Sequence, residues 1–163
     1  MLFKLCQWLE NTPVAHWISE SDFGFVSIET VHVLALTAVV GTISVVDLRL
    51  LNLASRHRTV LALSTEVLPI TWGAFVVAVI SGGLLFATKA TQYIDNIPFL
   101  LKMLGLALAG VNMFVFHHFS YRKVENWDAE AAHPHAASIA AVLSLALWTG
   151  VIVCGRWIGF TTH

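Results

Sequence analysis

The chain has 163 residues, of which 57% are hydrophobic and 12% are charged, and its formal net charge is −1. Soluble domains carry about 25% charged residues, so this composition argues against a soluble protein and indicates one that lies in a lipid bilayer. A net charge near zero gives no basis for nucleic-acid binding. Two cysteines far apart in the sequence make neither a disulfide framework nor a CxxC site.

The first segment is apolar but interrupted. Residues 2–10 predict a helix that is too short to span a bilayer and that ends before Pro13. Trp17 and Phe23 follow, and aromatic side chains beside a spanning helix suit the headgroup layer. We therefore expect residues 2–27 to lie flat on one membrane surface. The alternative is that this segment packs on the end of the bundle.

Four apolar runs follow, each long enough to cross a bilayer, which takes about 20 residues. Short polar loops separate them, so we expect an all-α, up-and-down four-helix bundle that forms a single membrane domain, residues 1–163. The second run is entered through Pro69, and its Gly82–Gly83 pair allows close approach of helix backbones in lipid. The predicted spans are residues 28–51, 66–88, 99–119 and 138–160.

Lys and Arg in short loops set the orientation of a membrane protein. The side opposite the termini has four of them in the loops after the first and third runs: Arg56, Arg58, Arg122 and Lys123. The other side has only Lys4 and Lys89. We therefore expect both termini to lie outside the cytoplasm.

Ionisable residues inside the spans are candidates for a functional site by default. His32 and Lys102 lie near the start of the first and third spans, and Asp47 and His117 lie fifteen residues further along the same spans. Fifteen residues of helix rise about 22 Å and leave the side chain about 60° from its starting direction. If these spans are neighbours, His32 faces Lys102 at one depth and Asp47 faces His117 at the other. Arg156, near the end of the fourth span, returns to the depth of His32 and Lys102.

Each of these residues also has a structural alternative. Lys102 and Arg156 can extend to the headgroups, where Arg156 can bind phospholipid. Asp47 can mark the end of a span, and a lone histidine in a membrane helix is usually a hydrogen-bonded packing element. No metal-binding signature such as HExxH is present, so the pairs His117–His118 and His133–His135 are expected to be surface histidines. The pattern identifies no catalytic residue.

Three stretches across residues 28–119 resemble the four-helix membrane families of HemJ, a bacterial protoporphyrinogen oxidase, and CopD, a copper-resistance protein. These stretches are VHVLALTAVVGTISVVDLRLL, ITWGAFVVAVISGGLLF and PFLLKMLGLALAGVNMFVFHH. They share with those families an early-helix His, a second helix with Trp and Gly, and a Lys that opens a later helix. The whole chain also resembles an uncharacterised bacterial four-span family that ends in LW-x-GVI-x-x-GR, and these resemblances imply a location in the bacterial inner membrane.

The HemJ resemblance implies a haem b whose iron is held by His32, with Lys102 as the sixth ligand or as a neighbouring partner. We expect Arg156 to hold a haem propionate, because an Arg–carboxylate pair is strong at low dielectric. The segment Val46–Leu50 departs from the Leu-Pro-Arg-Leu turn of HemJ-like proteins, so haem binding is the expectation here rather than porphyrinogen oxidation.

The expected function is therefore that of a b-type haem protein with an electron-transfer or oxidoreductase role, served by a redox partner or a larger membrane complex. The CopD resemblance implies copper binding or transport as an alternative, for which the chain offers four soft donors beyond the initiator: Cys6, Cys154, Met103 and Met113. A second alternative is a non-catalytic subunit or scaffold whose polar groups fix the helix register.

Overall fold

The computed structural model describes residues 1–21, 23–55, 57–120 and 135–161, and every regular element in this part of the chain is a helix. Four helices are long and apolar enough to cross a membrane: α3 (Gly24–Leu50), α4 (Val60–Thr88), α6 (Ile97–Val115) and α8 (His135–Thr161). The protein is thus an all-α membrane bundle with four spans, as the apolar runs predicted.

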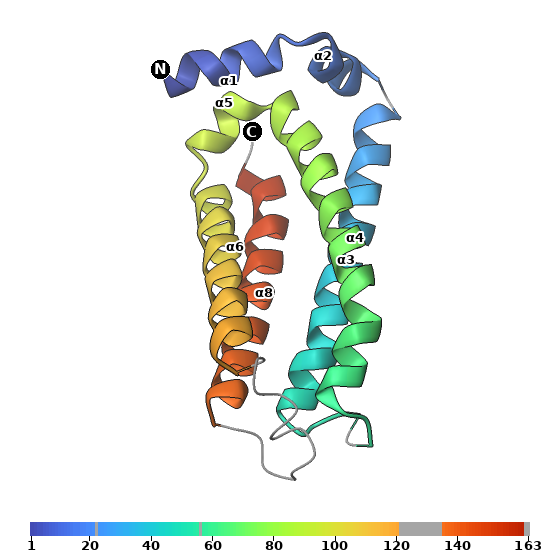
Figure 1. The fold of residues 1–163 in the computed structure, drawn as a ribbon. Helices are drawn as coiled ribbons and strands as arrows, with labels where there is room; N and C mark the ends of the chain where they lie inside the picture. Colours follow the sequence, from blue (N-terminus) through green and yellow to red (C-terminus); the bar gives the residue numbers. More distant parts are fainter. Residues whose placement is uncertain (22, 56, 121–134, 162–163) are drawn as a thin grey trace.

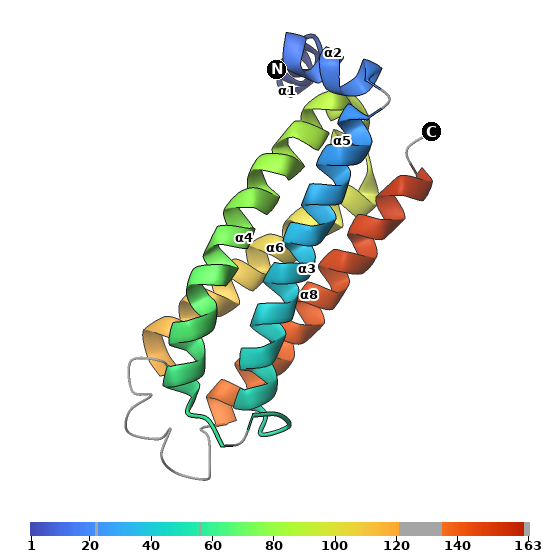
Figure 2. The ribbon, with the colours of Figure 1, turned by 90° about the vertical axis from the view of Figure 1, so that its right-hand side faces the viewer.

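The four long helices pack as two pairs (Figures 1 and 2). α3 lies along α4, and α6 lies along α8; the pairs meet through α3 and α8. Both termini lie at one end of the bundle, which we call the terminal end, and the connection between α3 and α4 lies at the other, the loop end.

Three short helices cover the terminal end: α1 (Leu2–Glu10), α2 (Pro13–Glu20) and α5 (Ala90–Ile94). α1 and α2 run across the ends of the long helices (Figure 1). The side chain of Thr12 caps α2, and Pro13 occupies the first helical position, where no backbone N–H is required. The carboxylate of Glu10 accepts hydrogen bonds from the backbone N–H and the hydroxyl group of Thr91, at 2.8 and 2.7 Å. This contact joins α1 to α5.

Several helices begin earlier than predicted; α3 begins at Gly24 rather than near residue 28, so the last residues of the predicted surface segment belong to it. α4 begins at Val60 rather than near residue 66, because Thr59 caps it by accepting a hydrogen bond from the backbone N–H of Ala62. Pro69 therefore lies inside α4 and not at its entrance. At the loop end, α6 continues into a π-helical turn, η1 (Phe116–Ser120).

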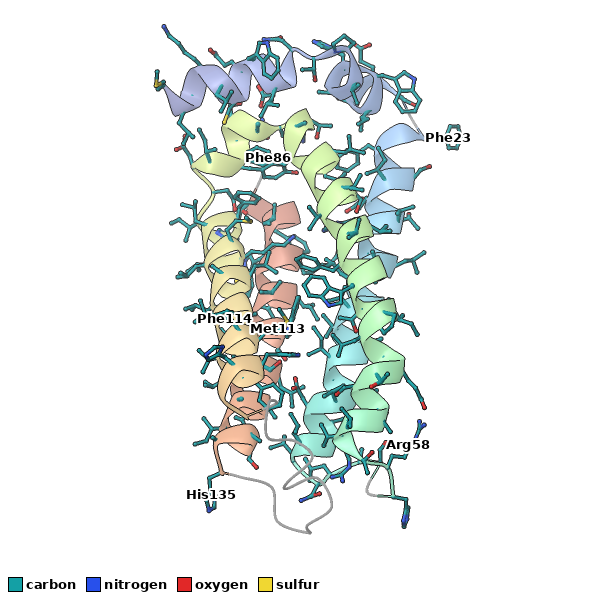
Figure 3. The ribbon with its side chains drawn as sticks, in the orientation of Figure 1. Phe23, Arg58, Phe86, Met113, Phe114 and His135 are labelled. Atoms are coloured by element: carbon teal, nitrogen blue, oxygen red, sulfur yellow. The ribbon has the colours of Figure 1, made fainter. Side chains whose placement is uncertain are left out.

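Few side chains are fully buried, and the long helices expose apolar residues on their outer faces, as expected in lipid. The middle of the bundle contains a small core of Val39, Ala109, Trp148 and Val151. Polar contacts also join the helices within each pair: Thr71 donates a hydrogen bond to Thr42 at 2.8 Å, and Asn112 donates to the Ala140 carbonyl at 2.9 Å. Figure 3 shows Phe23, at the start of α3, pointing away from the bundle.

Candidate functional site

His32 lies in the terminal half of α3, and its ring reaches α4. Nδ1 is 3.0 Å from the hydroxyl oxygen of Ser81, and that oxygen is 2.6 Å from the Val77 carbonyl oxygen one turn earlier on α4. A carbonyl oxygen only accepts, so the Ser81 hydroxyl donates to Val77 and accepts from His32. Nδ1 therefore carries the ring proton, and Nε2 keeps a lone pair.

Gly82 makes room for this ring. A Cβ atom at residue 82 would lie 2.9 Å from Cε1 of His32, which is closer than two carbon atoms pack. Position and tautomer of His32 are thus both set by one short stretch of α4.

Lys102 comes to the same place from α6, the opposite helix pair. It lies close enough for its charge to act on the His32 ring. Its side chain is half-buried and runs along Gly155 of α8, where a Cβ atom would be 3.7 Å from Nζ. Its ammonium group forms no ion pair or hydrogen bond with any residue that the structure describes. A cation in this position favours an anionic partner, because unpaired charge is costly within a membrane.

We call these five residues, His32, Ser81, Gly82, Lys102 and Gly155, the His32 site. Each long helix contributes to it: α3 the imidazole, α4 the serine and the first glycine, α6 the amine, and α8 the second glycine. The site lies in the terminal half of the bundle, on the side covered by the short helices.

Three aromatic rings lie on the terminal side of the His32 site. They belong to Phe86 of α4, Tyr93 of α5 and Phe99 of α6, and their centroids are 5.4 to 6.1 Å apart. Figure 3 shows Phe86 at the terminal end. Burial raises the pKa of the Tyr93 hydroxyl group, and the negative charge of Glu29 raises that pKa further. Tyr93 is therefore neutral at physiological pH.

Arg156, expected as a propionate anchor, lies outside the His32 site. It is exposed, and its guanidinium carbon is 5.7 Å from the ring centroid of Phe160, one turn further along α8. No described contact joins it to His32 or Lys102. The reason is angular: Gly155 faces Lys102, and the next residue of a helix points about 100° away from it.

At the loop end, the predicted contact between Asp47 and His117 is not formed. Asp47 is buried, and its carboxyl group faces Ser144 of α8, while Oδ2 has no hydrogen-bond partner among the residues that the structure describes. Nδ1 of His117 lies 3.1 Å from the Met113 carbonyl oxygen of its own helix. The physical reason is that α8, and not α6, packs against this part of α3. His133, of the second histidine pair, lies outside the described residues.

The part of the chain that the structure describes contains no cluster of side chains able to bind a bare metal ion. Within it, no three side chains of His, Cys, Asp or Glu come close enough to bind one ion. The soft donors expected for copper are also dispersed. Cys6 is buried on α1 while Cys154 lies on α8, and Met103 and Met113 are about 15 Å apart along α6.

Sequence patterns did not reveal Ser81 or Ser144, the hydroxyl groups that contact His32 and Asp47. Serine is common in membrane helices, where it usually bonds the carbonyl one turn earlier, as Ser81 also does. The only signal near Ser81 was the following pair Gly82–Gly83, which we interpreted as a place of close helix packing. The group that packs against Gly82 is the imidazole ring of His32, and only the structure shows this contact.

A family model described as "Family of unknown function (DUF6644)" matches residues 8–161. No curated protein matches the chain, and no solved structure does.

Proposed function

The chain belongs to the family of unknown function DUF6644, and we propose from the His32 site that it is a membrane protein that binds haem b and has an electron-transfer or oxidoreductase role. The proposal rests on one observation. The His32 imidazole is fixed with its Nε2 lone pair available, beside a lysine ammonium group that has no partner among the described residues.

The donors at the site suit a macrocycle better than a bare ion. A porphyrin brings four nitrogen ligands of its own, so the protein has to supply only an axial group, most often a histidine. It also brings carboxylates, which an unpaired cation stabilises at low dielectric. His32 and Lys102 supply one of each, whereas the described residues contain no three-residue set for a bare ion.

In this proposal, Ser81 holds the Nδ1–H of His32 and so directs Nε2 towards the iron. Groups that hold the second nitrogen of a ligating histidine usually change metal affinity by about 10- to 100-fold. Lys102 pairs with a propionate, and we assign this role to it rather than to Arg156, which faces away from the site. Haem, when bound, supplies one-electron chemistry.

The test is an absorbance spectrum of protein purified in detergent from haem-replete cells. We expect a Soret band in the wild type and its loss in His32→Ala. The matched control is His118→Ala, which removes an exposed imidazole stacked on Phe114 at the loop end and is expected to leave the band unchanged. Absence of a Soret band from the wild type refutes the proposal and favours the scaffold alternative.

A second measurement separates the ligand from the residues that position it. Titration of apoprotein with haemin is expected to show about 10- to 100-fold weaker binding in Ser81→Ala, with no change in Ser27→Ala, an exposed serine on α3. Lys102→Met is expected to loosen the haem or shift the band. If Ser81→Ala binds as the wild type does, Ser81 does not orient the ligand.

A further inference from the structure

The outer face of α8 has a shallow groove near the terminal end, with a volume of about 570 Å³. We call it the α8 groove; its lining residues are Ile152, Val153, Arg156, Trp157 and Phe160. The four apolar members are 46% to 65% exposed, so the groove faces away from the bundle and towards lipid.

Arg156 is the one charged residue among those that line this groove. Its guanidinium group lies over the Phe160 ring, and it makes no hydrogen bond or ion pair with a described residue. A guanidinium group has five N–H donors in a planar fork that fits two oxygens of a phosphate. A ligand that accepts hydrogen bonds and carries negative charge therefore complements it.

The depth of Arg156 limits what this ligand can be. The residue lies five positions before the end of α8 at Thr161, which corresponds to about 7.5 Å along the helix axis. Trp157 follows it, and tryptophan is enriched where the hydrocarbon meets the headgroups. The guanidinium group is thus at the level of lipid phosphates, while Ile152 and Val153 lie one turn deeper, beside the acyl chains.

We propose that the α8 groove binds a phospholipid with one net negative charge. Its phosphate accepts hydrogen bonds from Arg156, and an acyl chain runs along Ile152 and Val153. A zwitterionic lipid fits less well, because its own ammonium group competes with Arg156 for the phosphate. A second copy of this chain, related by a two-fold axis at the groove, would place two unpaired Arg156 side chains near each other.

The experiment uses the full-length protein and native mass spectrometry in detergent, with phosphatidylglycerol and phosphatidylcholine added separately. One arginine near the membrane surface is worth about a factor of five in binding an anionic lipid. We therefore expect Arg156→Gln to bind phosphatidylglycerol about fivefold more weakly. Lys89→Gln, which removes an exposed cation at the same end, is expected to bind it as the wild type does.

Arg156→Lys is a second variant that keeps the charge but loses the planar fork, and it is expected to bind with intermediate affinity. Equal binding of the two lipids by the wild type would overturn the proposal. An equal loss in Lys89→Gln would do so as well, because it would indicate a diffuse effect of surface charge. A dimer that Arg156→Gln abolishes would assign the groove to a second copy instead.

Discussion

Arg49 and Arg58 lie close together at the loop end but differ in what they contribute. Arg49 is buried, and it donates hydrogen bonds to the Arg58 carbonyl oxygen and to the side chain of Asn52. Asn52 has a φ of 56°, a left-handed conformation that asparagine tolerates better than most residues. The side chain of Arg58 is about half exposed and forms an ion pair with Glu66. The first arginine therefore holds the turn between α3 and α4, and the second lies on its surface.

Replacing these two arginines should have unequal effects on stability. Arg49→Met removes a buried guanidinium group and leaves two partly buried acceptors in the turn without their donor, so we expect it to lower the free energy of unfolding by about 1–3 kcal/mol. Arg58→Gln breaks an exposed ion pair and is expected to cost less than about 1 kcal/mol. Denaturant unfolding in detergent measures both. Equal losses would contradict a structural role specific to Arg49.

Among the elements, α5 has few residues and many connections. Its five residues bring Tyr93 against Phe86 of α4 and Phe99 of α6, whose rings also stack on each other. Its Thr91 donates hydrogen bonds to Glu10 of α1. α5 thus provides a connection between the two helix pairs in addition to the contact between α3 and α8. It also joins both pairs to the N-terminal helices. The partly buried Tyr93, whose hydroxyl pKa is raised, makes this connection sensitive to alkaline pH.

The direction of that sensitivity follows from the raised pKa of Tyr93. The unfolded chain loses the tyrosine proton at about pH 10, whereas the folded protein retains it to higher pH. Stability is therefore retained below about pH 10 and lost as the pH rises towards the folded pKa. Between about pH 9 and about pH 11, the unfolding temperature of the wild type should fall more than that of Tyr93→Phe. Parallel curves for the two proteins would show that Tyr93 is not the group responsible.

The whole molecule has a topology that labelling can test. α4 contains 29 residues, or about 43 Å of helix, which exceeds the hydrocarbon thickness of about 30 Å. Two exposed residues that flank it, His57 in the preceding turn and Lys89 directly after the helix, should therefore lie on opposite sides of the membrane. In a background without Cys6 and Cys154, an impermeant maleimide should label His57→Cys and Lys89→Cys from opposite sides. Labelling of both from one side would exclude this arrangement.

The sequence was sufficient to predict the four spans, because length and apolar character alone decide whether a helix crosses lipid. It also gave the depth of each polar residue, since helix rise is constant. Neither the length of the apolar runs nor the helix rise predicts which spans are neighbours. The expected pair of Asp47 and His117 required α3 to lie against α6, but α8 occupies that position. The charge of Lys102 nevertheless acts on the His32 ring at the terminal end.

The predicted start of α4 was wrong for a local reason. The predicted span begins near residue 66, after the polar residues Ser64 and Thr65, whereas α4 begins at Val60, because Thr59 supplies a cap about two turns before residue 66. Ser81 could not be identified for the opposite reason, since its role depends on a ring 49 positions earlier in the chain. The pattern of apolar residues therefore predicts neither helix caps nor contacts between side chains that are far apart in the sequence.

The pairing of α3 with α4, and of α6 with α8, also orders the biosynthesis of the protein. In each pair the two long helices follow one another along the chain, so the first pair can assemble while the ribosome is still translating the second. His32 and Ser81 belong to the early pair, and Lys102 and Gly155 to the late one. A molecule that needs both halves can therefore bind only after the last helix has entered the membrane.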